Sequence, residues 1–444
     1  MDLMAQAEAA YRARTPGSGR QFQQARQVMA GGISANVKFF TPYPPSMRRA
    51  EGACLWDVDG NRYLDYLLVY GAVILGHDHP AVRKAIETQL TEDGTPVFGT
   101  PNPRELELAQ LVQHLVPSAE RVRFTNSGLE ATLLCLRLAA AFNGRPQIAK
   151  FEGHYHGAHD QVLVSYAPPL AEAGAPEEPA PIADSRGVPA EVLENTLVLP
   201  WNDWDSTARL LRRHAARVSA VILEPVQGGF VPPEPGFLEK LRALTSGLDV
   251  LLVFDEVKTG FRLGLGGAQG RFGVRPDLTA LGKILGGGFP VGAVVGRADV
   301  LEQARPGKAS ESVFHSGTYN GHSTAMAAGS AVLRELERPG VYERLEALSD
   351  ELKARIHSAA RRHGVALQTP GVGPVFGLLF SDRPPRAYRD VARADVARRR
   401  ILDLRLLADG VYSRPNDRLN LSLAHSEEHI AETGEAIDRA LRGL

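Results

Sequence analysis

Residues 253–296 read VFDEVKTGFRLGLGGAQGRFGVRPDLTALGKILGGGFPVGAVVG and combine an acidic strand end with an isolated lysine. The apolar run LDVLLVF ends at Asp255, which Glu256 follows directly. Further along, Lys283 lies in Leu-Gly-Lys, between small residues and a triple glycine. Acidic strand ends and single lysines are each common, so the meaning of this stretch depends on the rest of the chain.

The length and charge of the chain limit what it can be. With 444 residues, it exceeds what one small core supports, so we expect two or more subdomains that share a large interior. The 50 Lys and Arg residues nearly balance the 51 Asp and Glu residues. This balance gives no electrostatic reason to expect nucleic acid or an anionic membrane as a partner. The expected partner is a small molecule or another protein.

The cysteines and the N-terminus predict a cytoplasmic location. Cys54 and Cys135 have neither metal-ligand spacing nor a disulfide framework, which fits a reducing compartment. Residues 1–20 lack a continuous apolar core and carry Asp2 and Glu8, so they do not resemble a secretory signal. No apolar run is long enough to span a bilayer.

Four apolar runs from residue 121 onward are continuous rather than alternating. They are RVRFT (121–125), QIAKFEG (147–153), SAVILEP (219–225) and DVLLVFDEV (249–257). Such runs indicate strands that helices cover on both faces. Helical segments accompany them, namely RELELAQLVQHLVP (104–117) and SGLEATLLCLRLAAAF (127–142). The central part is therefore expected to be α/β with a largely parallel sheet.

The flanking regions differ from the centre and predict a smaller α+β domain. Asp59-Gly60 between apolar flanks indicates a hairpin turn. After residue 325, a helix over 341–365 is followed by strand-like VFGLLF (375–380) and NLSLAH (420–425) and a final helix over 431–441. We expect residues 1–75 to join the small domain, 76–325 to form the large domain, and 326–444 to complete the small one.

Residues 167–189 read APPLAEAGAPEEPAPIADSRGVP and interrupt the α/β pattern. Their richness in Pro, Ala and Glu argues against a packed element. Two interpretations stay open, a disordered surface insertion and a lid over a neighbouring site.

Asp255 and Lys283 match two of the four groups that a pyridoxal phosphate (PLP) site needs: an amine for the aldehyde, an acid for the ring nitrogen, a phosphate cradle and a flat partner. Asp255 ends a strand, where parallel sheets place ligands, and a carboxylate there would stabilise a pyridinium. Its alternative role is to cap a helix or face solvent. Lys283 is preferred to Lys258 as the amine because its surroundings are small and apolar, and burial would lower its pKa.

The other two groups have candidates after neighbouring strands. Ser127-Gly128 opens a predicted helix, whose unpaired amides can bind phosphate, although such residues also cap helices for purely structural reasons. Tyr155, in FEGHYHGAHD, is the candidate for stacking on the ring. The nearby histidines, His154, His156 and His159, suggest a metal site only weakly, since no further ligand spacing accompanies them. No metal is therefore expected.

Several motifs together resemble a known family. They are EGACLWDVDGNRYLDY, ILGHDHPAV, KFEGHYHGAHD, LEPV, FDEVKTGFR, TALGKILGGGFPVGAVVG, HSGTYNGHSTAMAAG and SLAHSEEHI. They resemble class III PLP-dependent aminotransferases of fold type I, in the branch of glutamate-1-semialdehyde 2,1-aminomutase, from about residue 31 to the C-terminus. The resemblance implies a large domain with a mostly parallel sheet, and a smaller α+β domain built from the N- and C-terminal parts.

The resemblance also implies roles for individual residues. Lys283 would be the Schiff-base lysine, Asp255 the partner of the pyridinium and Tyr155 the stacking residue. Ser127, Gly128 and Leu129 would belong to the phosphate cradle. The remaining implied cofactor contacts are Val257 on the other ring face, Glu224 at an acidic strand end, and Thr318, which would reach the phosphate of the partner subunit in a homodimer with shared sites.

The chain departs from the family pattern at positions that bear on substrate. Leu129 stands where a threonine is usual, so a hydroxyl contact to phosphate is lost. Lys38 stands where the aminomutase has an arginine for the substrate carboxylate, and lysine supplies charge without the bidentate fork. Lys258 stands where methionine is common. Arg414 and Arg418 are candidate compensating carboxylate binders, with exposed surface arginines as the alternative.

These features favour a PLP-dependent aminotransferase that moves an amino group from an amino acid, β-amino acids included, to a keto or aldehyde acceptor by a ping-pong mechanism. The first alternative is the aminomutase itself, which forms 5-aminolevulinate. The second is a PLP-binding protein without turnover. Racemase and decarboxylase chemistry also stay open, because sequence does not fix which substrate bond lies perpendicular to the ring.

Overall fold

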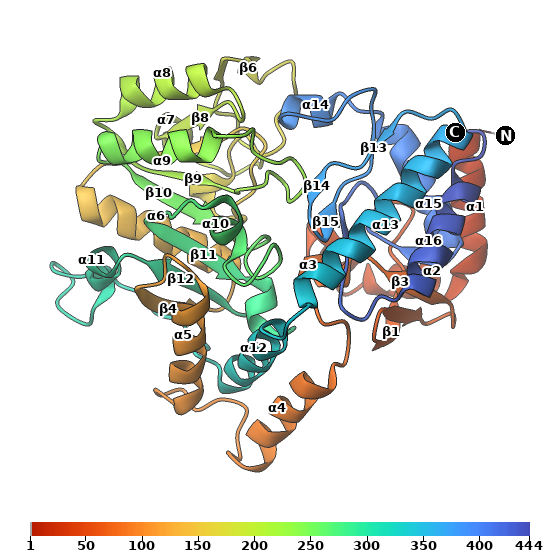
Figure 1. Ribbon diagram of the computed structural model, residues 1–444, viewed down its shortest axis with the longest axis horizontal. Helices are drawn as coiled ribbons and strands as arrows, with labels where there is room; N and C mark the ends of the chain where they lie inside the picture. The colour runs from red at the N-terminus through yellow and green to blue at the C-terminus, as the bar shows by residue number, and fades with distance from the viewer. Residues whose placement is uncertain (1) are drawn as a thin grey trace. The chain divides into compact units, whose positions relative to one another are not determined.

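The computed structural model describes residues 2–444, which form two compact units (Figure 1). Unit 2 comprises residues 80–339 and 385–393, and unit 1 comprises residues 2–79, 340–384 and 394–444. The domain boundaries that the sequence predicts at residues 75 and 325 remain predictions. No helix in the described part of the chain is both long and apolar enough to cross a membrane.

Unit 2 is built on a seven-stranded sheet whose strands follow the order β4, β12, β11, β10, β9, β5 and β8. Their bounds are Arg121–Thr125, Gly292–Gly296, Leu278–Gly282, Leu251–Asp255, Val218–Leu223, Gln147–Phe151 and Thr196–Leu199, respectively. β12 runs antiparallel to both of its neighbours, and every other pair is parallel. The prediction of a largely parallel sheet is confirmed, and so are its four predicted strands.

Helices cover both faces of this sheet, as the continuous apolar runs require. The helices of unit 2 are α4 (Pro80–Thr91), α5 (Pro103–Leu115), α6 (Gly128–Asn143), α7 (Ala190–Glu194), α8 (Trp204–His214), α9 (Phe237–Gly247), α10 (Gly267–Phe272), α11 (Ala298–Leu301), α12 (Ser323–Leu336) and α14 (Tyr388–Ala392). On one face, Ile222 and Val253 pack in a core cluster with α6. On the other, Leu223 and Phe254 pack with α8 and α9. Successive strand residues thus point to opposite cores.

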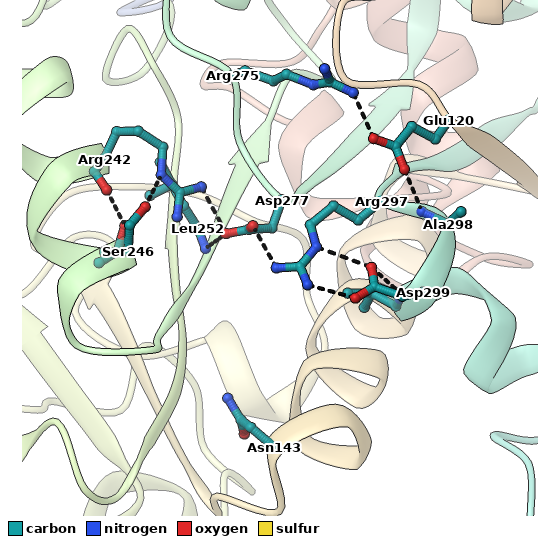
Figure 2. Close-up of polar contacts among 12 residues, drawn as sticks. Glu120, Asn143, Arg242, Ser246, Leu252, Arg275, Asp277, Arg297, Ala298 and Asp299 are labelled. Atoms are coloured by element: carbon teal, nitrogen blue, oxygen red, sulfur yellow. Dashed lines mark hydrogen bonds and ion pairs between the residues drawn. The ribbon is translucent and has the colours of Figure 1, made fainter.

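A buried carboxylate fastens the amino-terminal side of β10 and β11 (Figure 2). Asp277 precedes β11 and accepts hydrogen bonds from the Leu252 N–H at 2.8 Å and from Arg242 at 2.7 Å. Its other oxygen accepts from Arg297 at 3.0 Å, and Arg297 also pairs with Asp299. Because the donors satisfy the buried charge, the two strands are held in register, and so are the residues at their far ends.

Unit 1 combines long helices with short strands. Its helices are α1 (Leu3–Arg14), α2 (Pro16–Ala25), α3 (Leu68–Gly71), α13 (Val341–Arg362), α15 (Val396–Ala408) and α16 (Glu427–Ala440). Its strands are β1 (Met47–Glu51), β2 (Cys54–Asp57), β3 (Arg62–Asp65), β13 (Leu367–Gln368), β14 (Gly371–Val372), β15 (Val375–Phe376), β16 (Leu379–Phe380), β17 (Val411–Tyr412) and β18 (Leu419–Asn420). The hairpin predicted at Asp59-Gly60 joins β2 to β3, as expected.

The insertion at residues 167–189 is an ordered part of unit 2. It contains the hairpin of β6 (Gly174–Ala175) and β7 (Glu178–Pro179). The Asp184 carboxylate accepts from the backbone N–H groups of Tyr166 at 2.6 Å and Ala167 at 2.9 Å. Just before the insertion, the buried Lys150 amine donates to the carbonyl of Val164. The segment has few large apolar side chains to pack, and specific hydrogen bonds hold it instead.

Candidate functional site

The candidate residues of unit 2 lie where successive strands of the sheet end. Ser127 and Gly128 follow β4, Tyr155 follows β5, Glu224 follows β9, Asp255 ends β10, and Lys283 follows β11. These strands are parallel to one another, so their carboxyl ends lie along one edge of the sheet. That edge is where open α/β sheets bind ligands.

Asp255 is the buried acid of this edge, with 4% of its surface exposed. One carboxylate oxygen lies 2.8 Å from His156 Nδ1, and the other accepts from the Val257 N–H at 3.1 Å. The interpretation of Asp255 as solvent-facing is therefore wrong. Its neighbour Glu256 has a separate role, because it accepts from the Gln269 N–H at 3.2 Å in the first turn of α10. Asp255 therefore lies at the candidate site, whereas Glu256 caps the start of α10.

Lys283 is half-buried and begins a short 3₁₀ turn, Lys283–Gly286, directly after β11. Its backbone φ is +50°, in the left-handed region that residues with a Cβ atom rarely adopt. Conformations of this kind cluster at functional sites, where the surrounding structure holds them in place. At the preceding Gly282, a Cβ atom would lie 3.3 Å from Val257 Cγ1 and 3.4 Å from Gly128 Cα. A Cβ atom before Lys283 would therefore require Val257 to shift by a few tenths of an ångström.

The start of α6 offers backbone amides at the same edge. Ser127 is the N-cap, and its hydroxyl accepts from the Glu130 N–H at 3.2 Å. Glu130 in turn accepts from the Asn126 N–H at 2.7 Å. Because the first turn of a helix has no intrahelical acceptors, the amides of Gly128 and Leu129 remain for an anion, which the helix dipole also favours. The side chain of Ser127 is committed to the cap.

Replacing Gly128 with alanine should damage this corner. The added Cβ would lie 2.6 Å from both methyl carbons of Val257. Overpacking of this kind costs about 1–3 kcal/mol in free energy of unfolding, and the displaced helix start should also weaken anion binding. Thermal unfolding and PLP titration measure both effects. Gly270→Ala is the matched control, since its Cβ would meet nothing within 4 Å and alanine favours a helix. Equal behaviour of the two variants would contradict the prediction.

Tyr155 is held from two sides. Its backbone N–H donates to Glu224 Oε2 at 2.9 Å. Its ring centroid lies 5.0 Å from that of Tyr166 and 5.6 Å from Lys258 Nζ. Burial raises the pKa of the Tyr155 phenol, and the charges of Asp255 and Glu224 raise it further. The phenol is therefore neutral across the physiological range.

Glu224 is the buried carboxylate behind Tyr155. It is 2% exposed and forms an ion pair with Lys258. Burial alone would raise its pKa, but the charge of Lys258 lowers the pKa to about 2. Lys258, the rival of Lys283 in the sequence, is thus engaged by Glu224.

The histidines near Tyr155 contact neighbouring groups of the protein. Residues 2–444 contain no group of three His, Cys, Asp or Glu side chains arranged to hold a metal ion. His154 Nδ1 accepts from the Glu224 N–H at 3.0 Å, and burial lowers the pKa of His154 well below its usual value. His159 has its pKa lowered to about 4, also by burial. These two rings are neutral packing elements of the loop.

The remaining candidates lie elsewhere. Thr318 is exposed, in the segment between η5 (Glu302–Ala304) and α12. In unit 1, Lys38 donates to Ser34 at 2.8 Å and lines a cavity of about 400 Å³ together with Tyr70 and Tyr412. Arg414, also in unit 1, contacts the carbonyl of Phe39 at 3.5 Å, and its buried Nε has no hydrogen-bond partner within residues 2–444.

The second candidate arginine, Arg418, is less available. Its guanidinium pairs with the adjacent Asp417 at 3.1 Å, and its side chain is 11% exposed. The alternative of an exposed surface arginine is therefore wrong for Arg418. Because the charge of Arg418 already has a carboxylate partner, Arg414 is the better candidate for binding a substrate carboxylate.

Two contacts of the site were not foreseen from sequence. The sequence suggests only a metal-ligand role for His156, yet it is the hydrogen-bond partner of Asp255, and its Nε2 has no partner within the described residues. The pair of Glu224 with Lys258 was also missed. A polar residue one position past Tyr155, on the loop after a parallel strand, was the available signal for His156.

Comparison with known proteins identifies the family. A family model for class-III aminotransferases matches residues 40–441. The glutamate-1-semialdehyde 2,1-aminomutase of Desulforudis audaxviator (strain MP104C) is 44% identical over 432 residues, covering 96% of this chain and 97% of its own. An omega-transaminase from Sphaerobacter thermophilus has a TM-score of 0.91 at 37% identity, covering 97% of this chain and 98% of its own. A beta-phenylalanine aminotransferase from Variovorax paradoxus has a TM-score of 0.86 at 35% identity, covering 98% of this chain and 96% of its own.

The chain belongs to the class-III aminotransferase family. It has the α/β fold of PLP-dependent class III transaminases, is an enzyme of that type, and uses pyridoxal phosphate as its cofactor. The residues present fit this cofactor. A buried acid, the start of α6 and a lysine with positive φ lie along one sheet edge, where Gly128 allows Val257 to approach more closely than a Cβ atom would permit.

Proposed function

We propose that this enzyme transfers an amino group from an amino acid, β-amino acids included, to an external keto or aldehyde acceptor. The two substrates would use the site in turn, by a ping-pong mechanism. Similarity to transaminases across nearly the whole chain supports the reaction class.

Bound pyridoxal phosphate supplies an electron sink for the bond that the substrate gives up. Within this proposal, the carboxylate of Asp255 holds the proton on the ring nitrogen, and His156 orients that carboxylate. The amine of Lys283 holds the cofactor and then moves the substrate proton as general base and acid. The amides of Gly128 and Leu129 bind the phosphate, beside the cap formed by Ser127.

The two faces of the ring are proposed to contact Tyr155 and Val257. The position of the Val257 side chain beside Gly128 and Gly282 supports its part. Thr318 would complete the phosphate site of the partner subunit in a homodimer, and its exposure supports that assignment. We also infer a cytoplasmic location, in keeping with Cys54 and Cys135 being buried and free.

Lys38 and Arg414 are the proposed carboxylate contacts of the substrate. Both are cationic, and Arg414 reaches the carbonyl next to Lys38. A single ammonium on Lys38 attracts a carboxylate without fixing its plane, so carboxylates at different distances from the amine can be accepted. This tolerance is what a transaminase for α- and β-amino acids needs. Arg418 remains a weaker candidate because of its pairing with Asp417.

The hydrogen bonds that hold the insertion at residues 167–189 favour transfer to an external acceptor over the aminomutase reaction. Arg389, in α14, forms a two-pronged pair with Glu152 at 2.8 and 2.9 Å. It also donates to the carbonyls of Ala173 and Gly174, and the Tyr388 hydroxyl donates to that of Pro168 at 2.8 Å. A lid that retained an intermediate would have to break and remake these contacts in every turnover. A site that exchanges substrates freely has no such need.

Removal of the Arg389 side chain, which clamps the insertion through Glu152 and the carbonyls of Ala173 and Gly174, should loosen the insertion. Arg389→Ala leaves the buried Glu152 without its partner, which costs about 3 kcal/mol in free energy of unfolding. Proteases should then cleave residues 167–184 faster than in the native enzyme. Arg386→Ala, which removes an exposed pair with Glu234, is the control and should cost at most about 1 kcal/mol. If both variants are cleaved and unfold alike, the clamp does not hold the insertion.

Two half-reactions test the proposed function. Holoenzyme is mixed with an α- or β-amino donor, freed of small molecules, and then given pyruvate or 2-oxoglutarate. We expect the absorbance of the cofactor to change in the first step and to return in the second, with one equivalent of amino product formed. No spectral change with any donor in the panel would refute the proposal.

The aminomutase reaction is the second candidate, and the identity to the Desulforudis audaxviator enzyme favours it. It differs from the first in needing no external acceptor. Glutamate-1-semialdehyde alone is therefore given to the same preparation. Formation of 5-aminolevulinate without an added keto acid would establish this candidate and displace external transfer as the main reaction.

A further inference from the structure

Lys258 is a charged side chain of the site edge that the proposed mechanism does not use. It lies three residues after Asp255, and its side chain is 15% exposed. Its amine donates to Glu224 Oε1, while Glu224 Oε2 accepts from the N–H groups of Tyr155 at 2.9 Å and Gly228 at 3.2 Å. A lysine so enclosed, on a carboxylate that is 2% exposed, has a fixed position.

Both ends of this ion pair act on Tyr155. The carboxylate of Glu224 fixes the Tyr155 backbone, and the Lys258 ammonium lies 5.6 Å from the centre of the Tyr155 ring. A cation within about 6 Å of an aromatic ring attracts its electron-rich face. The Tyr166 ring, 5.0 Å away, limits the Tyr155 ring from another direction. The orientation of Tyr155 is thus set by a charge, a hydrogen bond and an aromatic neighbour.

We propose that Lys258 is a positioning residue, whose ammonium, fixed by Glu224, holds the Tyr155 ring in the orientation that contacts the cofactor. The inference rests on the proposed stacking of Tyr155 on the cofactor. A lysine that only neutralised Glu224 would not need to lie against an aromatic ring. Methionine at this position would lack the charge for both contacts.

Circular dichroism of the bound cofactor provides the test, because PLP is achiral and its signal reports how the protein orients the ring. Lys258→Met should reduce the signal per bound cofactor and raise the dissociation constant of PLP about three- to tenfold, the size of one cation–π contact. Lys258→Arg keeps a cation over the ring and should retain most of the signal. Unchanged dichroism in Lys258→Met would overturn the inference.

Lys240→Met is the matched control elsewhere in unit 2. Its ammonium lies 5.8 Å from the ring of Trp204, so the variant removes a similar cation–π contact that involves neither Tyr155 nor Glu224. The dichroism and the dissociation constant of PLP should stay at native values. If Lys240→Met lowers the signal as much as Lys258→Met does, the effect is general and the inference fails.

A double variant separates positioning from simple neutralisation. In Lys258→Met Glu224→Gln, no buried carboxylate is left unpaired, so stability should recover relative to Lys258→Met alone. The amide oxygen still accepts from the Tyr155 N–H, but the cation over the ring is absent. We expect the dichroism to remain low. Recovery of the native signal in the double variant would show that Lys258 only neutralises Glu224.

Tyr155→Ala distinguishes failure of this inference from failure of the proposed stacking. If Tyr155 stacks on the cofactor, this variant should lose at least as much dichroism as Lys258→Met does. An unchanged signal in Tyr155→Ala would refute the stacking itself. A reduced signal in Tyr155→Ala with a native signal in Lys258→Met would leave the stacking intact and refute only the role of Lys258.

Discussion

Lys283→Ala should lower kcat by about 10⁴-fold, the upper end of what a positioned general acid–base contributes. The variant loses both the amine that holds the cofactor and the group that moves the substrate proton. PLP should still bind without a covalent link, because the acid of Asp255 and the amides of α6 remain. Steady-state rates with saturating donor and acceptor, measured on protein of confirmed PLP content, give the comparison.

Lys308→Ala is the control for Lys283→Ala, because Lys308 is exposed and lies outside the site edge. It should retain native kcat. An added small primary amine should also restore part of the activity of Lys283→Ala by supplying the missing base. Full turnover in Lys283→Ala without such rescue would refute the role assigned to this lysine.

Asp255→Asn should lower kcat by about 10³-fold, the size of the loss when a preorganised charge-stabilising group is removed from an active site. An amide cannot balance a pyridinium, so the ring nitrogen loses its proton and the cofactor is a poorer electron sink. The variant also disturbs the buried contact with His156, which lies 2.8 Å from the carboxylate. A buried group left without its partner costs about 1–3 kcal/mol, so stability should fall as well.

Glu256→Gln is the matched control, because Glu256 is the adjacent carboxylate and is also buried. Burial raises the pKa of Glu256, although hydrogen bonds from α10 and Thr259 act in the opposite direction. Its replacement should lower stability while kcat per folded enzyme stays native. If Asp255→Asn and Glu256→Gln lose activity equally, Asp255 has no special relation to the cofactor.

The fold of unit 2 could be predicted because its signals are local. The run that ends in Asp255 is apolar at every position, as a strand covered on both faces must be, and β10 spans Leu251–Asp255. The helix expected after RVRFT is α6, and the helix expected over residues 104–117 is α5. Three strands of the seven-stranded sheet, β8, β11 and β12, are not predicted from the sequence. β11 and β12 flank the lysine-bearing glycine-rich turn, and their small residues hide the strand pattern.

The pairs within the site could not be predicted in the same way. That His156 contacts Asp255, and that Arg389 contacts Glu152, depends on contacts across 99 and 237 positions of sequence. No spacing rule encodes such separations. The insertion shows the same limit, since its Pro-rich composition suggests disorder as one interpretation, whereas hydrogen bonds from α14 and between its two ends, at Ala167 and Asp184, hold it in place. Which residues lie along the sheet edge was predictable, but their partners were not.

Reduction of the holoenzyme with borohydride, followed by peptide mapping, tests most directly whether the cofactor is held at the edge formed by Asp255, Gly128 and Lys283. Borohydride converts the link between PLP and a lysine into a stable bond, so mass spectrometry locates the labelled residue. We predict one modified site, Lys283. Labelling of Lys258, the neighbour paired with Glu224, or of the buried Lys150 in its place would contradict the assignment.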